Sequence, residues 1–165
     1  MVNAIDYQKR GQLNHTILLV EDDCNLLEVI HESLADEGYR LTKATSGEEA
    51  IALLKTKSFD LVITDLIMGR ENGISVLKKV KELNQETQVI IMTGTIDITF
   101  VIEALRLDAN DYILKPFALN DLLDRIGSCL EKLESTRGNR RSTKRKRVFN
   151  GHSLNSPGSI SHVVR

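Results

Sequence analysis

Short apolar runs alternate with longer stretches of mixed polarity from residue 16 to about residue 134. The central runs are continuously apolar, which is typical of strands buried on both faces of a parallel sheet. The run that begins at Leu61 is the clearest example, because three apolar residues stand between polar ones. We predict five strands, at residues 16–20, 40–44, 61–64, 89–92 and 112–114.

The segments between these strands carry apolar residues at helical spacing. Gly38 follows the first segment as a helix-ending glycine, and Ser46 with Glu49 forms the Ser-x-x-Glu pattern of a capping box. We predict five helices, at residues 24–37, 46–54, about 73–80, 96–107 and 119–133. Strands that alternate with helices form a parallel sheet covered on both faces, because crossovers are right-handed. The pattern therefore predicts an α/β fold.

The net charge of −1 conceals two oppositely charged parts. Residues 1–134 hold all 23 Asp and Glu against 14 Lys and Arg, a net charge of −9. Residues 135–165 hold 8 Lys and Arg and no acid, a net charge of +8. We predict a lead-in at 1–15, one acidic domain at 16–134 and a basic tail at 135–165.

The sequence contains no apolar run of the length that spans a membrane and no signal-peptide pattern at its start. The two cysteines, Cys24 and Cys129, lie in predicted helices without metal or redox spacing. We interpret them as reduced thiols and expect a cytoplasmic protein.

Three acids follow two of the predicted strands. Asp65 comes after the buried strand at 61–64, and Glu21 with Asp22 comes after the first strand. The carboxyl ends of parallel strands form the edge at which open α/β sheets bind ligands. Acids gathered there repel one another unless a hard cation lies among them, so we predict a Mg²⁺ (or Mn²⁺) site.

Several separated features resemble the receiver domain of two-component response regulators, the CheY-like superfamily, over residues 16–134. These features are Ile-Leu-Leu-Val-Glu-Asp-Asp at 17–23, Asp65 after a buried strand, Thr93 after Val-Ile-Ile-Met, and Ala-Asn-Asp-Tyr-Ile-Leu-Lys-Pro-Phe at 109–117. Each feature alone is a weak signal, but they occur together and in the family's order. The resemblance implies a flavodoxin-like, doubly wound, five-stranded parallel sheet of order 2-1-3-4-5 with five helices.

The resemblance further implies a phosphorylation-dependent signalling switch. Asp65 would accept a phosphoryl group from a histidine kinase or a phosphotransfer protein of a phosphorelay. The metal would be held by Glu21, Asp22, Asp65 and the backbone carbonyl of Ile67. Lys115 and Thr93 would contact the phosphoryl oxygens, since an ammonium group and a hydroxyl group suit them. Such a protein is not an enzyme beyond its own phosphorylation and slow dephosphorylation.

In this family the aromatic residue at the position of Tyr112 turns inward when the hydroxyl residue, here Thr93, moves toward the phosphoryl group. The change alters the surface of the fourth helix, fifth strand and fifth helix, where an output protein or a second copy would bind. On this chain that surface would include Ile96, Ile98 and Phe100.

Two positions set the expected rate of dephosphorylation. Ile67 and Thr95 stand two residues beyond Asp65 and Thr93, on the path of the attacking water. Ile67 offers that water no hydrogen bond, so we expect slow self-dephosphorylation. Gly69 stands where the family often has proline, and it should loosen the loop.

Three other interpretations remain open. The acids could bind a metal in a receiver-like scaffold that is regulated by partner binding alone, or the chain could be a receiver that has lost its output domain. A hydrolase with an aspartyl nucleophile would want a second acid at Ile67. The intact set of acids, Thr93 and Lys115 favours the phosphorylated switch.

The tail carries a basic run without an apolar period, so we expect it to be disordered. The run consists of Arg137, Arg140, Arg141, Lys144, Arg145, Lys146 and Arg147. It is interpreted either as a solvated tail or remnant linker, or as an anion-binding arm for nucleic acid or membrane phosphate.

Overall fold

The computed structural model describes residues 14–94 and 97–150, with side chains as far as residue 141. Expectations that concern residues 1–13, Thr95, Ile96 and residues 151–165 lie outside the described residues.

Five parallel strands form one sheet, in the order β2-β1-β3-β4-β5. The strands are β1 (Thr16–Val20), β2 (Arg40–Ala44), β3 (Leu61–Asp65), β4 (Gln88–Thr93) and β5 (Asp111–Leu114). Every residue of β3 and β4 is buried, as their continuous apolar pattern predicts. The predicted fold class and strand order are confirmed.

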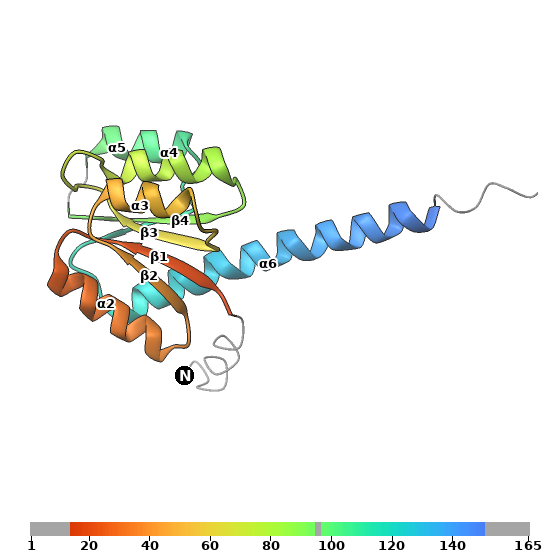
Figure 1. Cartoon of the computed structure of the whole chain (residues 1–165), viewed down its shortest axis with the longest axis horizontal. Helices are drawn as coiled ribbons and strands as arrows, with labels where there is room; N and C mark the ends of the chain where they lie inside the picture. The colour runs from red at the N-terminus through yellow and green to blue at the C-terminus, as the bar shows by residue number, and fades with distance from the viewer. Residues whose placement is uncertain (1–13, 95–96, 151–165) are drawn as a thin grey trace, which may run out of the picture. The chain divides into compact units, whose positions relative to one another are not determined.

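Helices cover both faces of the sheet, with α2 and α6 on one side and α3, α4 and α5 on the other (Figure 1). The helices are α2 (Cys24–Asp36), α3 (Gly47–Leu54), α4 (Gly73–Leu83), α5 (Ile98–Arg106) and α6 (Leu119–Asn150). Two apolar clusters result, one on each face, and β1 contributes Ile17 and Leu19 to one and Leu18 and Val20 to the other. A doubly wound sheet follows from this packing.

The predicted helix ends carry the expected caps. Gly38 has φ of 87° and follows α2, and the backbone N–H of Tyr39 donates to the carbonyl of Leu34 at 3.3 Å. Ser46 caps α3 by accepting from the N–H of Glu49 at 3.1 Å. These local bonds fix where the chain leaves each helix and enters the next strand.

The end of α6 was predicted wrongly. The apolar stripe ends at Leu133, but the helix continues to Asn150, so the first part of the expected disordered tail is helical. Arginine and lysine are good helix formers even where no apolar face is buried, and a search for apolar periodicity does not detect them. The described part of the chain divides into two units between residues 133 and 134, within α6.

Among the helices of residues 14–94 and 97–150, none is both long and apolar enough to cross a membrane.

Candidate metal and phosphoryl site

Parallel pairing of β1 and β3 brings the predicted acids together. Val20 lies opposite Thr64 in the register, so Glu21 and Asp65 both stand one residue further at the same edge. One carboxylate oxygen from each of Glu21, Asp22 and Asp65 lies within 4.8 Å of the others. Glu21 and Asp65 are buried, whereas Asp22 is exposed. The structure thus brings together all three acids that the sequence singled out.

Lys115 joins this cluster from the end of β5. Its Nζ lies 2.7 Å from Oε2 of Glu21 and 3.2 Å from Oδ2 of Asp65. The backbone N–H of Lys115 donates to the carbonyl of Thr93 at 2.7 Å, and the peptide bond between Lys115 and Pro116 is cis. Two strand ends therefore hold the ammonium group over the acids.

Burial and neighbouring charges shift the pKa values of Glu21 and Lys115 within the cluster. Burial raises the pKa of Glu21, the charge of Asp65 raises it further, and the hydrogen bond and charge of Lys115 only partly counter this rise. For Lys115, burial acts to lower the pKa, but the hydrogen bond and charge of Glu21, followed by the charge of Asp65, raise it overall. The ammonium group is therefore held in its charged form beside the carboxylates.

Asp23 belongs to the same acidic sequence but has a different role. Its side chain accepts from the backbone N–H groups of Asn25 and Leu26 and so caps α2. Its own N–H lies 3.2 Å from Oε1 of Glu21 and donates to it. An aspartate directly before a helical pattern is the signal that could have predicted this cap.

Thr93 is buried as the last residue of β4. Met92 pairs with Asp65 in the register, so Thr93 stands one residue beyond the acid on the neighbouring strand. This position suits a hydroxyl that reaches a group attached to Asp65.

The loop after β3 lies close to Asp65. The backbone N–H of Ile67 is 3.5 Å from Oδ1 of Asp65, and the Ile67 side chain is 57% exposed. A Cβ placed on Gly73 would lie 2.3 Å from the carbonyl oxygen of Asp65, whereas one on Gly69 would meet nothing within 4 Å. Only glycine fits at position 73, a requirement that the sequence alone did not reveal.

An apolar cavity of about 170 Å³ lies between α5 and the strands β4 and β5. Thr93 and Tyr112 both line it, together with Phe100 and Ala104 of α5. The Tyr112 side chain itself is 50% exposed. The cavity thus joins the hydroxyl position of the site to the outer surface, and no sequence pattern indicated it.

The three acids fit a hard divalent cation. Oxygen ligands at this mutual spacing suit Mg²⁺, and the negative charge of Glu21 and Asp65 is only partly balanced by Lys115.

The fold and the acidic edge define a class of protein, the CheY-like α/β receivers. The family model described as the response regulator receiver domain matches residues 17–127, and this chain belongs to that family. Members of the family act in phosphorylation-based signalling.

Relatives support this assignment over the same part of the chain. The chain is 38% identical over 110 residues to the transcriptional regulatory protein DltR of Streptococcus agalactiae, a match that covers 67% of this chain and 49% of DltR. It is 37% identical over 123 residues to the transcriptional regulatory protein ZraR of Salmonella typhimurium, which covers 74% of this chain and 26% of ZraR. The matched region therefore spans half or less of these relatives.

Solved structures of receiver domains are also similar to this chain. A CheY-like receiver domain protein from Methanospirillum hungatei superposes with a TM-score of 0.73 at 28% identity, covering 74% of this chain and 98% of that one. The BeF3-activated DrrB receiver domain gives a TM-score of 0.65 at 31% identity, with coverages of 72% and 99%.

Proposed function

We propose that Asp65 is the phosphoacceptor of this receiver domain and that its phosphorylation changes the surface formed by α5, β5 and α6. The observation that carries the proposal is the contact of Lys115 with both Glu21 and Asp65, beside a third acid, Asp22. This set supplies a nucleophile, a cation for a phosphoryl oxygen and ligands for a metal.

The reaction needs positioning and charge neutralisation more than covalent help. A carboxylate oxygen of Asp65 attacks the phosphorus of a phosphohistidine on a histidine kinase or phosphotransfer protein. The P–N bond breaks, its electron pair stays on the imidazole nitrogen, and an acyl phosphate forms on Asp65. Lys115 and Thr93 then hold oxygens of the new group.

Glu21, Asp22 and Asp65, with the Ile67 carbonyl, would hold Mg²⁺. Such a cation neutralises phosphoryl oxygens and the charge that the acids share. The structure of the donor set supports this, because all three side chains offer oxygen.

The cavity supports a route from the site to the surface. When Thr93 moves toward the phosphoryl group, the ring of Tyr112 can turn from its half-exposed position into the space beside Phe100 and Ala104. The phosphoryl group shifts the equilibrium because it interacts differently with the two positions of Thr93.

The surface over α5 and β5 is apolar and exposed. Its exposed large side chains are Ile98, Ile102, Leu105, Tyr112 and Leu114. An output protein or a second copy of the chain would bind here.

The free cysteines, Cys24 and Cys129, agree with the reducing cytoplasm in which we place the protein.

The test is incubation of the native chain and Asp65→Asn with acetyl phosphate, with and without Mg²⁺, followed by intact-mass analysis. We expect a magnesium-dependent gain of one phosphoryl group in the native chain alone. If acetyl phosphate gives no gain, a phosphorylated histidine kinase replaces it as donor. Failure of both donors would favour the metal-binding scaffold regulated by partner binding.

A further inference from the structure

The second half of α6 is charged rather than apolar. Residues 134–150 contain seven Lys and Arg, one acid (Glu134) and only two large apolar residues, Val148 and Phe149. The first half of the same helix packs Leu122, Ile126 and other residues into the core. Among residues 134–141, whose side chains the structure describes, none is buried, so burial does not account for the helical form of this part.

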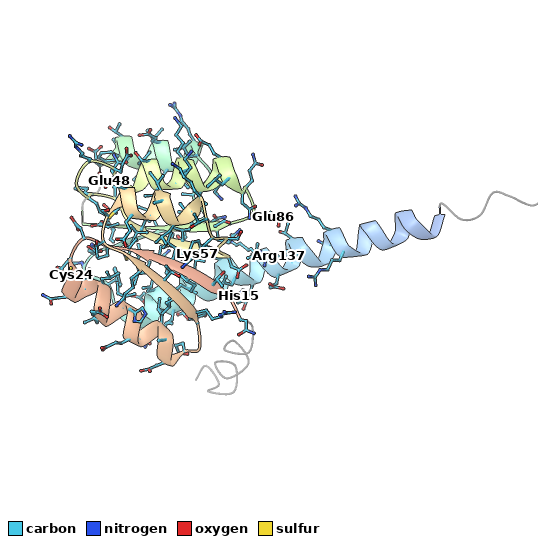
Figure 2. All side chains as sticks on the ribbon, viewed as in Figure 1. His15, Cys24, Glu48, Lys57, Glu86 and Arg137 are labelled. Atoms are coloured by element: carbon cyan, nitrogen blue, oxygen red, sulfur yellow. The ribbon has the colours of Figure 1, made fainter. Side chains whose placement is uncertain are left out.

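The helical backbone turns the basic run into a face. At 3.6 residues per turn, six of the seven basic positions fall within roughly 160° of the helix circumference. These positions are 137, 140, 141, 144, 145 and 147. Arg140 and Arg141 are exposed, while Arg137 lies 3.8 Å from Glu134 in an ion pair and is drawn on α6 in Figure 2.

Concentration of like charge on one face is unfavourable for an isolated helix. Positions 137 and 141, 140 and 144, and 141 and 145 are each four residues apart, and like charges at that spacing destabilise a helix. A partner with regularly spaced negative charge would remove this cost. The charge pattern thus calls for a polyanion.

The scarcity of apolar residues distinguishes between two kinds of polyanion, an anionic membrane surface and duplex DNA. A helix that lies on a membrane needs an apolar face as well as a basic one, and Val148 with Phe149 does not form such a face. The segment from 137 to 147 is about 15 Å long, which is comparable with the roughly 12 Å width of the major groove of duplex DNA. Duplex DNA also carries one negative charge per about 1.7 Å of its axis.

We propose that the basic face of residues 137–147 in α6 binds double-stranded DNA through its phosphates. The contacts are to the backbone, so binding is independent of base sequence. The proposed contacts do not involve Asp65, so the face binds DNA whether or not the chain is phosphorylated.

The test is fluorescence anisotropy of a labelled 30-base-pair duplex with the full chain, between 50 and 200 mM KCl, without a phosphodonor. At least four phosphate contacts predict a slope of log K against log salt of about −3.6, and hence a fall of about 150-fold in affinity over this range.

Two variants test the effect of the positive charge separately from the effect of helix formation. The quadruple variant Arg140→Gln, Arg141→Gln, Lys144→Gln and Arg145→Gln keeps good helix formers and should lose the salt-dependent binding. The matched control, Lys144→Arg with Lys146→Arg, keeps every charge and should bind as the native chain does. Far-UV circular dichroism checks that both remain helical.

Other outcomes would overturn the proposal. One is no binding at 50 mM KCl, and another is an unchanged slope in the quadruple variant. Binding to phosphatidylserine vesicles without binding to DNA would assign the face to membranes. Salt-sensitive self-association without DNA binding would assign it to the acidic part of a second copy. Because Asp65→Asn should bind DNA normally, failure here is distinguishable from failure of the phosphoacceptor proposal.

Discussion

The Nζ of Lys115 lies 2.7 Å from Oε2 of Glu21, although 94 residues separate the two in the chain. Glu21 is 1% exposed, so its carboxylate has little water to replace the ammonium group. This contact places a positive charge where the acids would otherwise repel one another, and the same charge opposes a bound metal ion.

Replacing Lys115 should therefore tighten metal binding. We expect Lys115→Ala to bind Mg²⁺ about tenfold more tightly than the native chain, a change of ~1.4 kcal/mol, because one nearby positive charge is removed. Isothermal titration calorimetry at pH 8 measures it. Lys43→Ala is the control, since Lys43 pairs with Glu28 on the surface. Weaker binding by Lys115→Ala would contradict the assigned metal site.

Ile67 should slow the loss of the phosphoryl group. Its exposed side chain offers the attacking water no hydrogen bond, so Ile67→Asn should lose phosphate several-fold faster than the native chain. Decay of phosphorylated protein, followed by intact mass, gives both half-lives. Ile98→Asn changes another exposed isoleucine, on α5, and should decay as the native chain does. Equal or faster decay in the native chain would refute this role for Ile67.

Gly69, in the loop after β3, and Gly73, the first residue of α4, form a matched pair. Gly73→Ala forces a Cβ against the Asp65 carbonyl, so we expect a loss of about 1–3 kcal/mol of stability and impaired phosphorylation. Gly69→Ala meets open space and should change stability by less than about 0.5 kcal/mol. Urea denaturation and acetyl phosphate labelling test both. Similar losses in the two variants would show that the close approach at Gly73 is not the cause.

Filling the cavity should uncouple phosphorylation from the surface change. Ala104→Leu adds bulk beside Phe100, where the Tyr112 ring would enter, and Asp65 does not line this cavity. We expect normal labelling by acetyl phosphate but no response of the Tyr112 resonances in NMR spectra. Ala52→Leu, at an exposed position of α3, should keep the response. A full response in Ala104→Leu would remove the cavity from the mechanism.

Cys129 should make stability depend on alkaline pH. Burial raises the pKa of its thiol from 9.0 to about 11, so between these values the folded chain keeps a proton that the unfolded chain loses. Stability from this group is therefore present below pH 9 and falls as pH rises toward 11, by up to about 2.7 kcal/mol. Denaturation series from pH 8 to 11 should show a steeper fall for the native chain than for Cys129→Ala. Parallel curves would mean that the thiol does not titrate as described.

Local sequence signals predicted much of the fold. The caps at Gly38 and Ser46 and the continuous apolar strands were readable because they depend on residues close in the chain. The end of α6 was not, because the helix continues past Leu133, the last residue of its apolar stripe, into a basic stretch without apolar periodicity. The expected contribution of Thr95 to dephosphorylation lies outside the described residues and stays a prediction.

The sequence by itself determined the order of the elements, the acids at the strand ends and the division of charge along the chain. Each of these follows from the type and spacing of nearby residues. Only the tertiary structure decided that Lys115 contacts Glu21, that Gly73 must lack a side chain, and that Thr93 and Tyr112 share one cavity. Those relations depend on strand register and on helix packing across the sheet, which bring together residues that no local pattern connects.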